Sequence, residues 1–294
     1  SSFTIQPNQI MYIKSLSAVP WFISPIFNFF TTTDVYSIGG DIMTLLNYSN
    51  LQGYDCRNMF GGLVWLPIAG IGQMPNPDAI SKLIRFENDF KLSSVLEQYC
   101  YAQMFSDCTG LTSLPDNLLQ SITLEQDCYD GMFSNTGITS IPNNFLPATT
   151  LVDGCYEGMF MNCISLTSVP SNLLHATNLA AWCYFNMFSG CTSLTTAPAL
   201  PATTLVGECY RQMFSGCTSL DSVIPFADDI SAYHCLENWL DNVANTGTLY
   251  NLGTATYATD SPSGIPTGWV QDIQVPNYFY VEDISGSNNT LTIK

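Results

Sequence analysis

The sequence predicts an α/β fold, built as a solenoid of short parallel strands and short helices with a cap at each end. Two observations predict it. A CYxxMF motif recurs at steps of 26 to 28 residues, and the segments LTSxP and ATTL recur between its copies. One such repeat is too small to bury its own apolar face, whereas stacked repeats bury a continuous core lined by ladders of identical side chains.

The CYxxMF motif predicts the helical part of each repeat. Its complete copies start at Cys100, Cys128, Cys155, Cys183 and Cys209. A degenerate copy, CLENWL, starts at Cys235, and a partial copy, CRNMF, starts at Cys56. The methionines of the complete copies are Met104, Met132, Met159, Met187 and Met213. Cys and Met are four residues apart, as are Tyr and Phe, so the motif predicts one or two helical turns with a single apolar face. We expect these Cys and Met residues to form structural ladders.

The LTSxP segments predict one short strand in each repeat, because the sequence is short and β-branched and Pro ends it. They occupy residues 111–115, 138–142, 166–170, 194–198 and, one residue longer, 220–225. In the first four of these segments, a pair of small hydroxyl residues follows the leading Leu or Ile, and one residue of each pair should point outward. The threonines are Thr112, Thr139, Thr167 and Thr195. The resulting hydroxyl strip either binds sugars or a partner's backbone, or serves solvation and β-propensity.

The repeats divide the chain into three parts. Residues 1–55 do not repeat and are expected to form an N-terminal cap. The solenoid covers residues 56–245, with an irregular coil at 56–99 and regular coils at 100–234. Residues 246–294 are expected to form a C-terminal cap and a β-hairpin or the start of another module. In CLENWL, Trp239 replaces Met and Leu240 replaces Phe, and this bulk suits a plug that closes the stack.

The CYxxMFxxCTSLT motif with its PATTL block resembles the BspA-like leucine-rich repeats, which are related to the Treponema pallidum type. Such repeats occur in surface proteins of gut Bacteroidetes and in proteins of their phages. The resemblance covers roughly residues 35–275, is strongest at 183–205 and 209–220, and fails between Cys56 and Cys100. The period also lies in the range of about 20–29 residues typical of leucine-rich repeats. The resemblance implies a right-handed solenoid and a surface-exposed binding role, and it implies no catalytic residues.

The cysteines allow two interpretations. The chain has 11 Cys, and four repeats hold a pair eight residues apart, such as Cys100 with Cys108. The thiols are either free and buried as small apolar ladder residues, or paired within each repeat across a turn. No pairing scheme uses all of them, because the total is odd.

Composition excludes several classes of protein. The net charge is −17 and charged residues make up only 11% of the chain. Arg211 is the only Lys or Arg between Lys91 and Lys294, so the chain lacks the clustered bases that nucleic-acid binding needs. The most apolar stretch, 18–30, is interrupted by prolines and is shorter than the roughly 20 residues of a membrane span. We therefore expect neither nucleic-acid binding nor membrane insertion.

No catalytic or metal-binding constellation stands out, and no cofactor is expected. His234 adjoins Cys235, but neighbours on one helix do not face each other. Adjacent carboxylates occur at Asp228–Asp229 and Glu282–Asp283, without the spacing of a calcium loop. These pairs are interpreted as solvated loop charges, so no metal site is expected.

The variable positions of the motif indicate a different kind of site. Phe185 is apolar at a place that is mostly polar in other repeats, and Arg211 is the only base of the array. Both are candidate binding residues on an outward face, together with the four threonines; the alternative is unconstrained surface.

The leading functional hypothesis is a recognition module without enzymatic activity. It would bind a protein or glycan on a cell surface, either as part of a phage tail fibre or other virion appendage or as a bacterial surface adhesin. This places it outside the cell, on a virion or a bacterial surface, as a component of a larger homo-oligomeric assembly. The alternative hypothesis is a structural spacer or virion component that has no ligand of its own.

Overall fold

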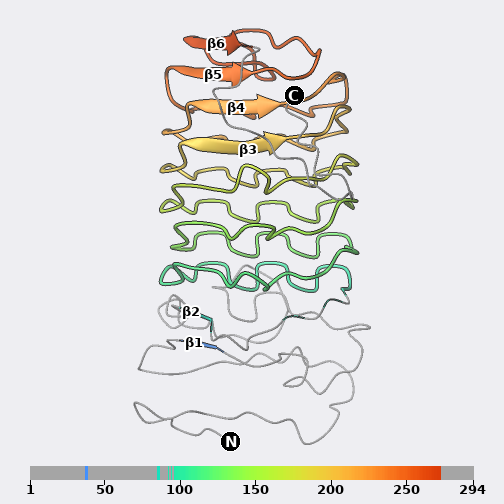
Figure 1. Cartoon of the computed structure of the whole chain (residues 1–294), viewed down its shortest axis with the longest axis vertical. Coiled ribbons are helices and arrows are strands. Elements are labelled where there is room, and N and C mark those ends of the chain that lie inside the picture. Colours follow the sequence, from blue (N-terminus) through green and yellow to red (C-terminus); the bar gives the residue numbers. More distant parts are fainter. Residues whose placement is uncertain (1–36, 39–84, 87–91, 93, 95, 273–294) are drawn as a thin grey trace, which may run out of the picture.

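The computed structural model describes residues 37–38, 85–86, 92, 94 and 96–272. From residue 96 onward the repeats lie one on top of another, and the labelled strands β3 to β6 occupy the C-terminal end of this stack (Figure 1). Strands β3 (Thr196–Leu200), β4 (Ser222–Pro225), β5 (Gly247–Tyr250) and β6 (Trp269–Asp272) form a four-stranded parallel sheet in sequence order. A second parallel pair joins β1 (Ser37–Ile38) to β2 (Arg85–Phe86).

The predicted parallel strands are present in the later repeats. Strands β3 and β4 overlap the LTSxP segments at 194–198 and 220–225. In earlier repeats the same segment contributes only an isolated parallel bridge, between Ser140 and Ser168. Isolated parallel bridges also join the ATTL-type segments, as between Thr150 and Asn178. The extended segments therefore pair from one repeat to the next, although few of them are long enough to form a regular strand.

The predicted helices are wrong for the part of the chain that the structure describes, which contains no helix. In the CYxxMF segments, successive backbone amides alternate between two kinds of acceptor. The amide of Asp130 donates to the Asp127 carbonyl three residues earlier, whereas the amide of Gly131 donates to the Glu157 carbonyl of the next repeat at 2.7 Å. In an α-helix every amide would donate to the residue four positions earlier. The segment is therefore a series of tight turns, half of whose amides bond to the neighbouring repeat.

A left-handed backbone conformation at every fourth residue produces these turns. In the repeat that starts at Cys155, the residues with positive φ are Gly154 (62°), Gly158 (54°) and Asn162 (58°). The same three positions have positive φ in the other repeats from Tyr99 to Asn242. As a result, two inward residues alternate with two outward residues, and the trace runs in and out in regular steps (Figure 1).

The inward residues form ladders that run along the stack. The tyrosine rings are stacked with centroids 5.8 to 6.0 Å apart, from Tyr101 to Tyr210. The phenylalanine rings, from Phe105 to Phe214, are 5.6 to 5.8 Å apart. The Cys and Met residues named above as ladder residues are fully buried, each with 0% exposure. Each complete repeat therefore adds the same four side chains to one continuous core.

Trp239 lies at the C-terminal end of the ladders. Its side chain is fully buried, its ring centroid is 5.8 Å from that of Tyr257, and its indole N–H donates to the Gly264 carbonyl at 2.7 Å. The repeats continue beyond it as β5 and β6. The expected cap at 1–55, most of the irregular coil at 56–99 and the expected hairpin after residue 272 lie outside the described residues. Within the described ranges, no helix is long and apolar enough to cross a membrane.

Candidate binding surfaces

The ten described cysteines are buried thiols, and no disulfide joins any two of them. In one column the thiols donate to the phenylalanine carbonyl of the preceding repeat; for example, Cys191 Sγ lies 3.1 Å from the Phe160 oxygen. Burial raises the pKa of Cys163 to about 11 and that of Cys155 to about 12. Since the thiolate is the reactive form, these cysteines are suited to packing and hydrogen bonding rather than to nucleophilic attack.

Glu282 and Asp283 lie outside the described residues, whereas His234, Cys235, Asp228 and Asp229 have structural partners. His234 stacks on Tyr233 with ring centroids 3.7 Å apart, while the Cys235 thiol donates to the Ile230 carbonyl at 3.2 Å. Asp228 accepts hydrogen bonds from the backbone amide and the hydroxyl of Thr254 at 2.8 and 2.7 Å. Among the described residues, no group of three or more His, Cys, Asp or Glu side chains is placed to hold a metal ion.

The four threonines predicted as binding residues, Thr112, Thr139, Thr167 and Thr195, lie at the same position of successive repeats, and all four are exposed. The expectation that only one residue of each hydroxyl pair points outward is wrong, because Ser113, Ser140, Ser168 and Thr196 are exposed as well. The reason is that two outward residues lie between two buried ones in each LTSxP segment, as with Thr112 and Ser113 between Leu111 and Leu114. The CYxxMF segment has the same pattern. The hydroxyls of Thr139 and Thr167 lie 3.3 and 3.2 Å from the threonine carbonyl of the preceding repeat. Those two hydroxyls therefore bond within the stack.

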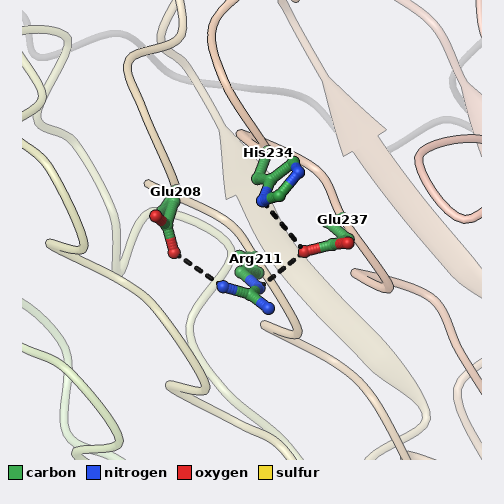
Figure 2. Close-up of polar contacts among 4 residues, drawn as sticks. All are labelled: Glu208, Arg211, His234 and Glu237. Carbon is green, nitrogen blue, oxygen red and sulfur yellow. Dashed lines mark hydrogen bonds and ion pairs between the residues drawn. The ribbon is translucent and has the colours of Figure 1, made fainter.

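Phe185 and Arg211, the other two predicted binding residues, are in contact. The guanidinium carbon of Arg211 lies 5.7 Å from the centroid of the Phe185 ring, within the range of a cation–π interaction. Arg211 also forms two ion pairs, each with a nitrogen–oxygen distance of 2.8 Å, to Glu208 and Glu237 (Figure 2). His234 Nδ1 lies 3.3 Å from the same Glu237 carboxylate (Figure 2). We call these five residues the Arg211 cluster.

Two exposed aromatic side chains border the Arg211 cluster. Trp182 is 48% exposed and hydrogen-bonds to Glu208, and Tyr233 is 70% exposed and stacks on His234. The Arg211 guanidinium lowers the pKa of Glu208, so the Glu208 carboxylate stays negatively charged beside Arg211, the only Lys or Arg of the repeats. Trp182 comes directly before Cys183, and Tyr233 comes two residues before Cys235. Sequence reasoning compared only the two positions inside CYxxMF, and comparing the position before the cysteine would have revealed Trp182.

In the preceding repeats, the same outward positions hold carboxylates. Burial, followed by the charge of Asp127, raises the pKa of Asp130 to about 6. Burial, followed by the charges of Asp130 and Asp127, raises the pKa of Glu157 to about 7. Along this face the stack therefore changes from acidic at Asp127–Glu157 to aromatic and basic at Trp182–Arg211. Only the later part offers the rigid aromatic and arginine side chains that are enriched at binding hot spots.

The raised carboxylate pKa values predict that the protein becomes less stable as pH increases. Between the ordinary pKa values of 3.8 and 4.5 and the raised values of about 6 and 7, the folded chain binds protons that the unfolded chain has released. Stability is therefore lost as pH rises through this window. Replacing Glu157 with Gln is expected to stabilise the protein at pH 8 by about 1–2 kcal/mol, allowing for partial exposure, and to have little effect at pH 4. Thermal unfolding of both proteins at the two pH values measures this.

The matched control for this prediction is Glu125→Gln, which removes an exposed carboxylate of the neighbouring repeat segment. It is expected to change the free energy of unfolding by no more than about 0.5 kcal/mol at either pH. Equal effects of the two substitutions at pH 8 would contradict the assignment of the pH dependence to Glu157.

Comparisons with known proteins add no relative of this chain. No protein-family model, no curated protein and no solved structure matches it. The class that the structure itself defines is therefore a stack of repeats ending in a four-stranded parallel sheet, with the Arg211 cluster on its surface.

Proposed function

We propose that this chain is a recognition module without enzymatic activity, built as a capped right-handed solenoid of BspA-like leucine-rich repeats. It binds a protein or glycan on a cell surface. The chain is itself part of a virion appendage, such as a phage tail fibre, or of a bacterial surface adhesin, and it belongs to a larger homo-oligomeric assembly. The observation that carries the proposal is the Arg211 cluster with its border of exposed aromatic residues.

The physical properties of the cluster support binding. Trp182 and Tyr233 present large aromatic surfaces to solvent beside the cluster, and exposed apolar patches with a polar rim are typical of interaction sites. Arg211 is already fixed by Glu208 and Glu237, so little side-chain entropy is lost when a partner contacts it. The stacked core below restrains the backbone of all these residues. A preorganised aromatic and arginine patch on a rigid scaffold is a typical arrangement for a binding hot spot.

The test is adsorption of the purified protein to cells of gut Bacteroidetes, compared between the wild type and Trp182→Ala with Arg211→Ala. Losing one hot-spot side chain costs about 2 kcal/mol, or about 30-fold in apparent affinity, so losing both is expected to reduce it by up to about 1,000-fold. Ile122→Ala, which truncates an exposed apolar residue outside the cluster, is the matched control and should leave adsorption unchanged.

The same experiment addresses the alternative of a structural spacer. The regular ladders favour it, because identical repeats set a fixed length. A spacer would show no adsorption by the wild-type protein, and the double variant would behave identically. That result would overturn the recognition role, provided that both proteins unfold cooperatively at similar temperatures.

A further inference from the structure

A groove of about 700 Å³ lies on the outward face of the four-stranded sheet, on a different segment of each repeat from the Arg211 cluster. Its floor is a row of residues in register across the strands. Thr196 pairs with Ser222, Ser222 with Thr248, and Thr248 with Val270. Tyr250 and Asp221 also line the groove, which contains no Lys, Arg or His. Its volume is in the usual range for small-ligand sites, about 300–1,000 Å³.

The hydroxyls of this row differ from those of the earlier threonine column. The hydroxyls of Thr139 and Thr167 bond to carbonyls of the preceding repeat. Within the described part of the chain, the hydroxyls of Thr196, Ser222 and Thr248 make no protein hydrogen bond and face the groove. The groove therefore presents hydroxyl groups that are available for hydrogen bonds with a ligand, one on each of three neighbouring strands. In the earlier repeats, the hydroxyls of Thr139 and Thr167 are already used in hydrogen bonds within the protein.

We propose that this groove is a binding site for a neutral polysaccharide that runs across the strands, along the axis of the stack. Adjacent strands are about 4.8 Å apart, and successive pyranose rings of an extended polysaccharide advance by a similar step. Three successive rings thus each meet one hydroxyl residue, at Thr196, Ser222 and Thr248, and a fourth ring meets the apolar side chain of Val270. The Asp221 carboxylate accepts hydrogen bonds from sugar hydroxyls, and Tyr250 offers an aromatic surface for a ring face.

The charge of the groove and of the whole chain determines the class of sugar. Asp221 is a carboxylate, no base lines the groove, and the net charge is −17. Anionic sugars are therefore repelled, and a neutral chain fits the many uncharged hydroxyls. This inference deepens the proposed recognition role but concerns another surface, so the two fail independently.

The experiment is calorimetric titration of the full chain with three neutral tetrasaccharides, cellotetraose, mannotetraose and maltotetraose, and with their disaccharides. Tetragalacturonate serves as the anionic comparison and the fully deacetylated chitosan tetramer as the cationic one. At least one neutral tetramer is expected to bind, at least tenfold more tightly than its disaccharide and than either charged tetramer. The failure of all three neutral tetramers to bind, or stronger binding of a charged tetramer, would overturn the proposal.

Variants locate the site. Thr248→Val keeps a β-branched residue in the strand and removes one hydroxyl, so the affinity is expected to fall by about three- to tenfold, the value of a single hydrogen bond. Thr177→Val, an exposed threonine outside the groove, should change nothing. Trp182→Ala with Arg211→Ala should retain sugar binding even if adsorption to cells is lost. Equal losses in Thr248→Val and Thr177→Val would show that the sugar binds elsewhere.

Discussion

Replacing Phe160 with Ala is expected to lower the free energy of unfolding by about 3–5 kcal/mol, the usual cost of deleting a buried aromatic side chain. Phe160 is fully buried and stacks between Phe133 and Phe188, with centroid distances of 5.7 and 5.8 Å. Its ring is also tilted against that of Phe145 at 6.3 Å. The truncation therefore opens a cavity in the middle of a ladder and removes contacts with two neighbouring repeats. Equilibrium denaturation in urea, followed by tyrosine and tryptophan fluorescence, measures the loss.

The stacked arrangement makes the loss hard to repair locally. The repeats above and below are held at a fixed spacing by backbone hydrogen bonds, such as that from the Phe160 amide to the Met187 carbonyl at 2.9 Å. The cavity cannot close without breaking them. Ile122→Ala, which truncates a side chain that is 71% exposed, is the control and should cost no more than about 0.5 kcal/mol. A loss below about 1 kcal/mol for Phe160→Ala would contradict a continuous aromatic ladder.

The inward positions of the core could be predicted from the sequence, but their backbone conformation could not. Cys100 and Met104, and Tyr101 and Phe105, are four apart and all buried. A spacing of four fits the apolar face of a helix, and it fits equally well a series of turns in which two inward residues alternate with two outward ones. The signal that could separate the two is the frequent occurrence of Gly and Asn at every fourth residue of the motif, as at Gly154, Gly158 and Asn162 in the repeat that starts at Cys155. These residues tolerate positive φ and are poor helix formers.

The candidate binding surfaces could be predicted only in part from the sequence. Phe185 and Arg211 were identified because they depart from the repeat, and the structure places them in contact. The groove was not identified, because its row of hydroxyls depends on the register between β3, β4, β5 and β6. The later strands belong to segments whose sequences no longer match the motif. A register between non-identical repeats is set by tertiary packing, which periodicity alone does not reveal.

Gly137 marks a place where one repeat is shorter than its neighbours. Cys108 and Leu111 are three residues apart, whereas the equivalent Thr136 and Ile138 are only two apart, yet the four side chains are all buried in the same ladders. The shorter connection passes close to the preceding repeat. A Cβ atom on Gly137 would lie 2.3 Å from the Thr109 carbonyl oxygen. The absence of a side chain is therefore what lets this repeat keep its register with one residue fewer.

Replacing Gly137 with Ala is consequently expected to destabilise the protein by about 2–3 kcal/mol, because the obstacle is backbone and the two repeats must separate to admit the methyl group. The matched control is Gly207→Ala, where the nearest atom to the added Cβ is the Tyr233 carbonyl oxygen at 3.7 Å. That substitution fits without strain and should stabilise the protein by about 0.4–1 kcal/mol, since it restricts the unfolded chain. Urea denaturation of the two variants tests the opposite signs. If Gly137→Ala were as stable as Gly207→Ala, the backbone of the shortened repeat could not lie as close to the Thr109 carbonyl as the structure places it. The spacing between these repeats would then not be set by direct backbone contact.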